Sequence, residues 1–325
     1  MACQNFEMKQ LELFINNTPS IDEIDQDLSS TLHYLLSNKN ISLEIVKIIL
    51  EKQKNIFCVD KNGRNAIHIY CSNKNAELDI LNVLIEKKID PSIRDNEKKI
   101  PIFYLCENNF LKNEISKKLI LLLIEKSNLS SCDLKYKNCL HYYLSRKYID
   151  IDIVKTFLDK KISINQTDNN SRSFLHYAIV NPHVSSQVIS LLIQNKSDPN
   201  QKDSSGKNCL HIISENKSPS FFIFKILVKL TLNVFSTTSS SDGSNTPLHS
   251  ACIQRNLDAV FYLLYYNCYN TIPNRFGLTP FQICDKNFSQ DFSQIFRYFQ
   301  ENKTILWTKQ THFFFPKKIK EQSDF

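Results

Sequence analysis

Glycine is scarce in this chain, which has four glycines in 325 residues. Enzymes that bind nucleotides through glycine-rich loops need several of them in adjacent turns, because the backbone there adopts positive φ or approaches a phosphate closely. The short motifs of serine hydrolases, zinc proteases and phosphate-binding loops are also missing. We therefore predict a protein that is not an enzyme, with no catalytic residues, no metal site and no cofactor.

Long apolar runs are missing too. The most apolar stretch, residues 221–235, is interrupted by Lys225 and Lys229, so no segment reaches the ~20 apolar residues of a membrane span. The first residues lack the charged-then-apolar pattern of a secretory signal. Ten cysteines without such a signal predict reduced thiols and a cytoplasmic location, with the nucleus as the alternative. We expect no membrane contact and a monomer.

The charge balance is mildly basic. Forty Lys and Arg residues stand against 33 Asp and Glu residues, for a net charge of +7. Such a bias permits an acidic partner without requiring nucleic acid.

The histidines show an internal repeat. Six of the eight follow Leu or Ile, and three of their spacings are 35 residues. These six are His33, His68, His141, His176, His211 and His249. Phe103 stands 35 residues after His68, and Gln282 stands 33 after His249. These eight positions, here called the histidine slots, indicate eight repeats of 33 to 38 residues.

A second marker lies eight residues before each slot. There the chain carries Asp25, Asp60, Asp95, Asp133, Asp168 and Asp203, followed by Ser241 and Asn274. Gly63, Gly206 and Gly277 lie five residues before their slots, and Gly243 lies six before. Glycine confined to one recurring place predicts a tight turn at that place in every repeat.

Each repeat also predicts two helices. A short helical stretch holds the slot, and a more apolar stretch follows, as at residues 43–50 and 188–193, where apolar residues recur with helical spacing. Pro91 and Pro199 each lie 23 residues after a slot and end the second helix. One repeat cannot bury its apolar face alone, so neighbouring repeats must stack. The predicted fold is an all-α solenoid.

Two motifs carry a family resemblance. Thr246-Pro247-Leu248-His249 and the loop Lys196-Ser197-Asp198-Pro199-Asn200 resemble the Thr-Pro-Leu-His box and the loop of the ankyrin repeat. The resemblance covers roughly residues 6 to 300. It implies a capping half-repeat at 1–25, about eight ankyrin repeats at 26–302, and an aromatic and basic tail at 303–325. The abundance of Asn, Ile and Lys is typical of AT-rich genomes, such as those of some protists and large DNA viruses.

The histidines and cysteines fit a structural role. The resemblance implies that each histidine bonds groups near the hairpin. Histidines of stacked repeats would lie ~8–10 Å apart, too far to share a zinc ion. Several cysteines hold fixed places relative to the slot and are expected to be small buried thiols. They are Cys71, Cys106, Cys139, Cys209 and Cys252.

One polar position in the repeat is a candidate part of a binding surface. Four residues before the slot, five consecutive repeats carry a base, namely Arg64, Lys99, Lys137, Arg172 and Lys207. The resemblance places this position on the hairpin, facing a concave groove. Cations about one Debye length apart would form a positive stripe for an acidic protein segment. The alternative is an ordinary solvated turn. By the same resemblance, further groove candidates are Asn62, Asn73, Asn108, Arg146, Asn170, Asn216 and Arg275.

The function predicted from this pattern is non-catalytic binding of a protein partner in the groove and at the hairpin tips. An alternative is an adaptor that couples the partner to a second complex, such as a ubiquitin ligase, through the tail; the tail could instead cap the last repeat or begin a further domain. Nucleic acid is disfavoured, because aromatic residues do not interleave with the bases in the sequence pattern.

Overall fold

The computed structural model describes residues 17–18, 21–110, 113–160, 162–217, 220–266, 268 and 271–287. The chain divides into two units. Unit 1 comprises Met1–Ile213 and Ser220–Asn233, and unit 2 comprises Ser214–Pro219 and Val234–Phe325. The cap expected at 1–25 lies mostly outside the described residues, and the tail at 303–325 lies wholly outside them.

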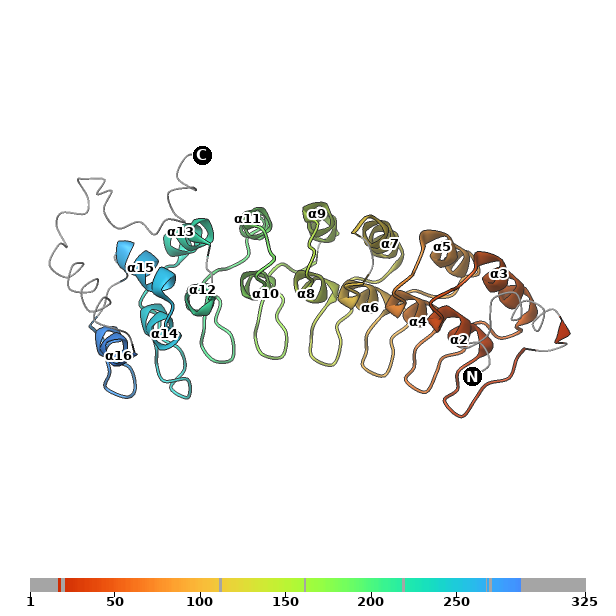
Figure 1. Cartoon of the computed structure of the whole chain (residues 1–325), viewed down its shortest axis with the longest axis horizontal. Helices are drawn as coiled ribbons and strands as arrows, with labels where there is room; N and C mark the ends of the chain where they lie inside the picture. Colours follow the sequence, from red (N-terminus) through yellow and green to blue (C-terminus); the bar gives the residue numbers. More distant parts are fainter. Residues whose placement is uncertain are drawn as a thin grey trace. The chain divides into compact units, whose positions relative to one another are not determined.

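Unit 1 consists of paired helices in two rows (Figure 1). The inner row holds α2 (Thr31–Ser37), α4 (Ala66–Ser72), α6 (Pro101–Glu107), α8 (Cys139–Leu144), α10 (Phe174–Val180) and α12 (Cys209–Glu215), whose last two residues belong to unit 2. The outer row holds α3 (Leu43–Lys52), α5 (Leu78–Glu86), α7 (Asn113–Lys126), α9 (Ile151–Asp159), α11 (Ser186–Gln194) and α13 (Phe221–Leu230). Consecutive inner helices from α2 to α10 pack on one another, as do consecutive outer helices. The described residues form no β-strand, only two isolated bridges. The expected all-α solenoid is confirmed.

The histidine slot is the third residue of each short inner helix, and where it holds histidine the ring closes a capping box. In α4 the Asn65 side chain accepts the backbone N–H of His68 at 3.2 Å, and the Asn65 N–H donates to His68 Nδ1 at 3.1 Å. Both donors would otherwise lack a partner at the start of a helix. The same box begins α2, α8, α10 and α14. This use of the ring explains why a polar side chain recurs in the core.

In His33, His68, His176 and His249 the other ring nitrogen bonds to the next hairpin. His68 Nε2 lies 3.1 Å from the carbonyl oxygen of Lys99, and His33 Nε2 lies 3.1 Å from that of Arg64. A carbonyl can only accept, so Nε2 carries the proton and the neutral ring uses both nitrogens. Burial lowers the pKa of His68 to about 4. The structural role implied by the resemblance is confirmed for these histidines.

The aspartate eight residues before six of the slots organises the hairpin turn. Its Oδ1 accepts two backbone N–H groups, from the residues two and four positions later; for Asp133 these come from Lys135 and Lys137, both at 2.8 Å. Asn274 makes the same pair of bonds in the eighth repeat. The third residue after the aspartate has positive φ, which is +78° at Gly63 and +58° at Tyr136. The predicted recurring turn is thus confirmed, although four of the eight repeats build it without glycine.

Adjacent hairpins of unit 1 also bond to each other. The Asn96 N–H donates to the Asn62 carbonyl at 2.8 Å, and the Ser204 N–H donates to the Asn170 carbonyl at 2.9 Å. The same link joins each successive hairpin from the first repeat to the sixth. Every hairpin therefore has its position set by the one before it.

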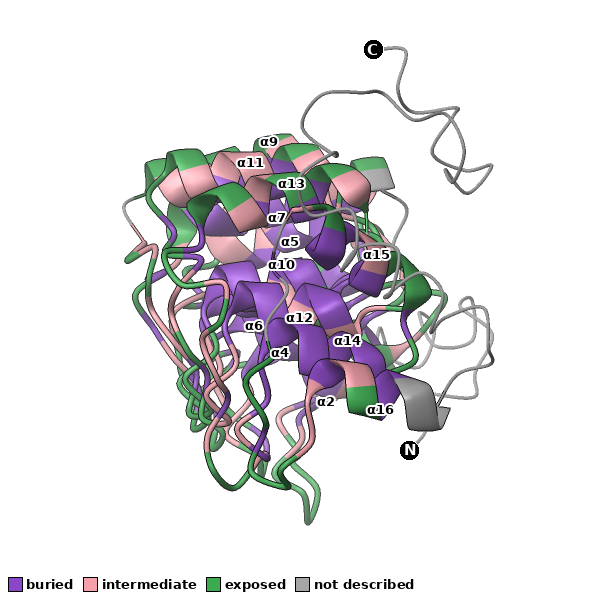
Figure 2. Ribbon diagram, turned by 90° about the vertical axis from the view of Figure 1, so that its left-hand side faces the viewer, coloured by how far each residue is buried: buried purple, intermediate pink, exposed green. Residues whose placement is uncertain are grey.

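The core of unit 1 lies between the two rows. The faces of the outer helices that the apolar spacing predicted are buried: Ile45, Val46 and Ile49 of α3 and Leu192 of α11 are at most 2% exposed. In Figure 2 the inner helices are mostly buried, whereas the hairpin tips are exposed. Burial of apolar surface between repeats is the main stabilising contribution in such a stack.

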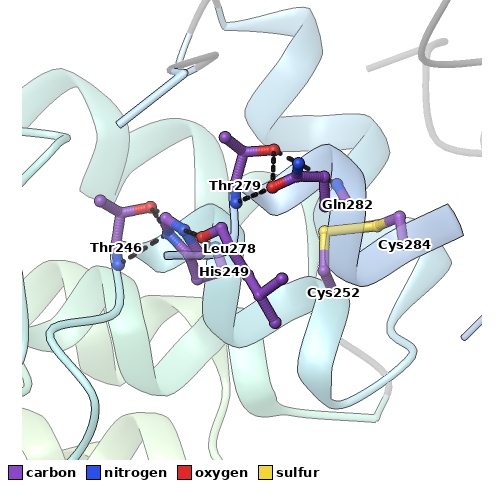
Figure 3. The surroundings of a disulfide bond; sticks show 7 residues. All are labelled: Thr246, His249, Cys252, Leu278, Thr279, Gln282 and Cys284. Carbon is purple, nitrogen blue, oxygen red and sulfur yellow. Dashed lines mark hydrogen bonds between the residues drawn. A yellow bond between two sulfur atoms is a disulfide. The ribbon is translucent and has the colours of Figure 1, made fainter. Parts of the chain in front are cut away.

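Unit 2 contains α14 (Pro247–Ile253), α15 (Leu257–Tyr265) and α16 (Pro280–Asn287), with α14 packed on both others. Gln282 fills the slot of the eighth repeat, and its Oε1 accepts the Thr279 N–H at 2.8 Å, much as His249 Nδ1 accepts that of Thr246 at 3.2 Å (Figure 3). Gln282 thus accepts the backbone N–H at the start of its helix, which is the bond that Nδ1 of the histidine accepts in other repeats.

The cysteine prediction needs one correction. Cys71, Cys106, Cys139 and Cys209 are buried free thiols, as expected, and burial raises the pKa of Cys106 to about 12. Cys252, however, forms a disulfide with Cys284 that joins α14 to α16 (Figure 3). The expectation of reduced thiols throughout was wrong because the two residues face each other only once these helices pack.

Candidate functional site

The five bases of the predicted stripe all lie on hairpins of unit 1 at equivalent places. In each, the backbone N–H donates to Oδ1 of the aspartate four residues earlier, at 2.8–2.9 Å. The turn therefore fixes the backbone position of each of these basic residues. Their side chains are partly buried, except that of Arg172, which is exposed. These bases are Arg64, Lys99, Lys137, Arg172 and Lys207.

The second carboxylate oxygen of each turn aspartate takes one of two partners. In the third, fourth and fifth repeats a tyrosine hydroxyl donates to it, from Tyr104 at 2.5 Å, Tyr142 at 2.5 Å and Tyr177 at 2.7 Å. Tyr34 does the same for Asp25 in the first repeat.

Where isoleucine replaces the tyrosine, an arginine lies near that oxygen instead. Ile69 stands at the tyrosine position of the second repeat, and there Arg64 Nε donates to Asp60 at 2.8 Å. Ile212 stands there in the sixth repeat. Arg172 reaches across from the fifth repeat, and its Nε lies 3.8 Å from Asp203 Oδ2, too far for a hydrogen bond.

Tyrosines alternate with the lysines in space. The Lys99 ammonium lies over the rings of Tyr104 and Tyr142, at 5.5 and 5.3 Å from their centroids. The Lys137 ammonium lies over Tyr142 and Tyr177, at 5.5 and 5.2 Å. These distances are those of cation–π pairs. The statement that aromatic residues do not interleave with the bases was therefore wrong.

The signal for this row was present in the sequence but was missed. A tyrosine recurs one residue after the slot in four of the repeats, at Tyr34, Tyr104, Tyr142 and Tyr177. We call the surface formed by Lys99, Lys137, Arg172 and the last three of these tyrosines the basic face.

The cations of the basic face differ in how far they are neutralised. Lys99 pairs with Glu97 at 3.1 Å and Glu107 at 3.4 Å, and its side chain is 14% exposed. Lys137 makes no ion pair with any described residue. The position of Glu107, four residues after the slot, holds Ser145 in the fourth repeat and Val180 in the fifth. The uncompensated positive charge thus lies in the fourth and fifth repeats.

Three of the predicted contact residues form hydrogen bonds to the preceding repeat. The Asn73 amide donates to the carbonyls of Leu36 and Asn38, at 2.8 and 2.7 Å. The Asn108 amide donates in the same way to two backbone carbonyls of the second repeat. The Arg146 guanidinium donates to two backbone carbonyls of the third repeat. Their side chains are buried and tie each inner helix to the end of the previous one, so we do not retain them as candidate contacts.

The remaining candidates are divided between the units. Asn62 and Asn170 are exposed at hairpin tips of unit 1. Asn216 and Arg275 lie in unit 2, where the Asn216 carbonyl accepts the Asn256 amide and the Arg275 guanidinium donates to the Ser240 carbonyl at 2.8 Å. Their contact with a partner stays a prediction.

A comparison with family models identifies the fold. Models of three ankyrin repeats match residues 1–95, 32–120, 102–203 and 183–274. The chain belongs to the ankyrin-repeat family. Ankyrin repeats are generally protein–protein interaction modules and are typically non-catalytic. A search of curated proteins finds no match.

Three further predictions concern membrane-spanning helices, metal sites and the C-terminal tail. Among the described residues, no helix has the length and apolar character needed to cross a bilayer. Within the same residues, no three His, Cys, Asp or Glu side chains are grouped so as to hold a metal ion. The tail at 303–325 lies outside the described part, so the adaptor hypothesis stays a prediction from the sequence.

Proposed function

We propose that this protein binds an acidic segment of a protein partner against the basic face, without catalysis. The observation that carries the proposal is the row of cations and tyrosines on successive repeats, in which Lys137 has no carboxylate partner among the described residues. Carboxylates of a partner would supply the charge that Glu107 supplies to Lys99. Because the hairpins are bonded to one another, the surface is preorganised and binding orders few protein groups.

A protein partner is favoured over a single nucleic-acid strand for a physical reason. Proteins that bind such strands stack bases on exposed aromatic rings. Here each tyrosine of the basic face lies under at least one lysine ammonium, and its hydroxyl is bonded to the turn aspartate. The rings are therefore engaged as partners of the lysines. A nucleic-acid binder would instead show a strong affinity for an isolated nucleic acid, falling linearly with salt on log–log axes.

Charge reversal tests the proposal. The Lys137→Glu/Arg172→Glu double variant should lose the proteins that the wild type captures from a cell lysate, most markedly at low ionic strength. The control is Lys47→Glu, an equivalent change on the exposed side of outer helix α3. Capture of the same proteins, in the same amounts, by the double variant would contradict a role for the basic face.

A cytosolic or nuclear location forms part of the same proposal. It is supported by the seven free cysteines among the described residues, which outnumber the two that form a disulfide. Localisation of a tagged chain in its source cell would test it.

A further inference from the structure

A hollow of about 480 Å³ lies beside the basic face, between the loop after α8 and the end of α10. Tyr177, Val180 and Pro182 form its apolar part, and Lys147 and Arg172 bring positive charge to it. Its volume is within the range of sites that enclose a small ligand or a side chain. The hollow shares Tyr177 and Arg172 with the basic face, so one bound segment could occupy both.

The charge around the hollow is of one sign. None of the residues that line it is acidic, and the Arg172 side chain is 49% exposed, with its nearest carboxylate 3.8 Å from Nε. Its other guanidinium nitrogens can donate to a ligand, and a planar guanidinium matches the two oxygens of a carboxylate.

An apolar side chain is exposed at the same place. Val180 is 57% exposed, although its position is polar in the four preceding repeats, at Ser37, Ser72, Glu107 and Ser145. In the third repeat this position neutralises the local lysine through Glu107. In the fifth repeat it offers apolar surface next to an incompletely paired arginine, a combination suited to an apolar side chain with a carboxylate beside it.

We propose that this hollow anchors the partner by taking an apolar side chain flanked by an acidic residue. The apolar group would lie against Tyr177, Val180 and Pro182, while the carboxylate pairs with Arg172 and Lys147. The inference rests on the proposed function and deepens it, because it assigns to one place a sequence preference that a uniform positive stripe would not have.

The decisive variant is Val180→Glu, which gives the fifth repeat the residue type that the third has at this position. The new carboxylate would pair with Arg172 and repel an acidic ligand, and the apolar contact would be lost. The matched control is Leu232→Glu, the same change of charge at a side chain of unit 1 that is 91% exposed. Both positions are exposed, so thermal melts should show that both variants fold.

The probe is a display library of random dodecapeptides selected against the full chain. Enriched peptides are remade with the acidic residue replaced by its amide or with the apolar residue replaced by glycine. The inference expects an adjacent apolar and acidic pair among the enriched peptides, and a loss of about tenfold or more in affinity from either replacement or from Val180→Glu. Leu232→Glu should bind like the wild type.

Two outcomes would overturn the inference and separate it from the proposed function. If peptides bind, lose binding on Lys137→Glu but tolerate Val180→Glu and the glycine replacement, the basic face stands and the anchor is refuted. If no enriched peptide depends on Lys137, Arg172 or Val180, the basic face is refuted together with the anchor.

Discussion

Removing the hydroxyl of Tyr142 tests the idea that the turn aspartates need a second donor. In Tyr142→Phe the ring remains under the ammonium groups of Lys99 and Lys137, so only the bond to Asp133 is lost. That bond is 2.5 Å long, and Asp133 is 6% exposed. Its other oxygen already accepts two backbone N–H groups. Hydrogen bonds to charged groups contribute about 1.5–3 kcal/mol, and we expect a loss of that size in the free energy of unfolding.

The measurement is equilibrium urea unfolding followed by far-UV circular dichroism. Tyr136→Phe is the matched control, since Tyr136 lies three residues after the same aspartate and is 65% exposed; its loss should stay within about 0.5 kcal/mol. Burial and Asp133 both raise the pKa of Tyr142, so the hydroxyl donates throughout the neutral range and the difference should not change between pH 6 and pH 9. Equal midpoints for the two variants would refute the reasoning.

Three further predictions concern the histidines, the core and the disulfide. Because burial lowers the folded-state pKa of His68 to about 4, the unfolded chain binds more protons below about pH 6.5, and this residue should cost about 2 kcal/mol of stability between pH 7 and pH 5. Urea midpoints at the two pH values should differ less in His68→Gln, and an unchanged difference would contradict the assignment. Leu192→Asp puts an unpaired charge where the side chain is fully buried and should lower stability by about 4 kcal/mol or more, or split the melt; a melt like that of Gln187→Asp, on the exposed side of α11, would show that the helix does not pack as described. Cys284→Ser opens a link between residues 32 apart in sequence and should destabilise unit 2 by about 3–4 kcal/mol in the chain-entropy account; dithiothreitol should lower the melting temperature of the wild type and leave that of the variant unchanged, and an equal response of both would count against the disulfide.

The parts of the fold that the sequence predicted are those in which one side chain accepts hydrogen bonds from nearby backbone N–H groups. Asp133 must accept two N–H groups of its own turn, and His68 must accept one at the start of its helix. Such bonds are local, so they impose fixed spacings that a single sequence displays. The recurring hairpins and the paired helices of the described residues could therefore be predicted without a structure.

The parts that were not predicted depend on contacts between repeats. Asn73 and Asn108 look like solvated loop residues in the sequence, yet their amides bond carbonyls about 35 residues away. Cys252 and Cys284 pair across two helices. The tyrosine row was missed for a different reason, since its spacing is regular but its meaning depends on which lysine lies over which ring. Spacing along one repeat cannot specify such geometry.

This division bears on where recognition residues should be sought in the chain. A residue whose side chain accepts a backbone N–H is constrained to a few chemical types. Gln282, which accepts such a bond in place of histidine, illustrates this. The position that holds Glu107, Ser145 and Val180 in successive repeats carries no such bond in the fifth repeat and can change freely. In the third repeat it neutralises a lysine of the stripe, and in the fifth it exposes apolar surface. If the basic face binds the partner as proposed, specificity depends on departures from the repeat pattern, and substitutions at this position should alter which partner binds while leaving the hairpins and their capping boxes intact.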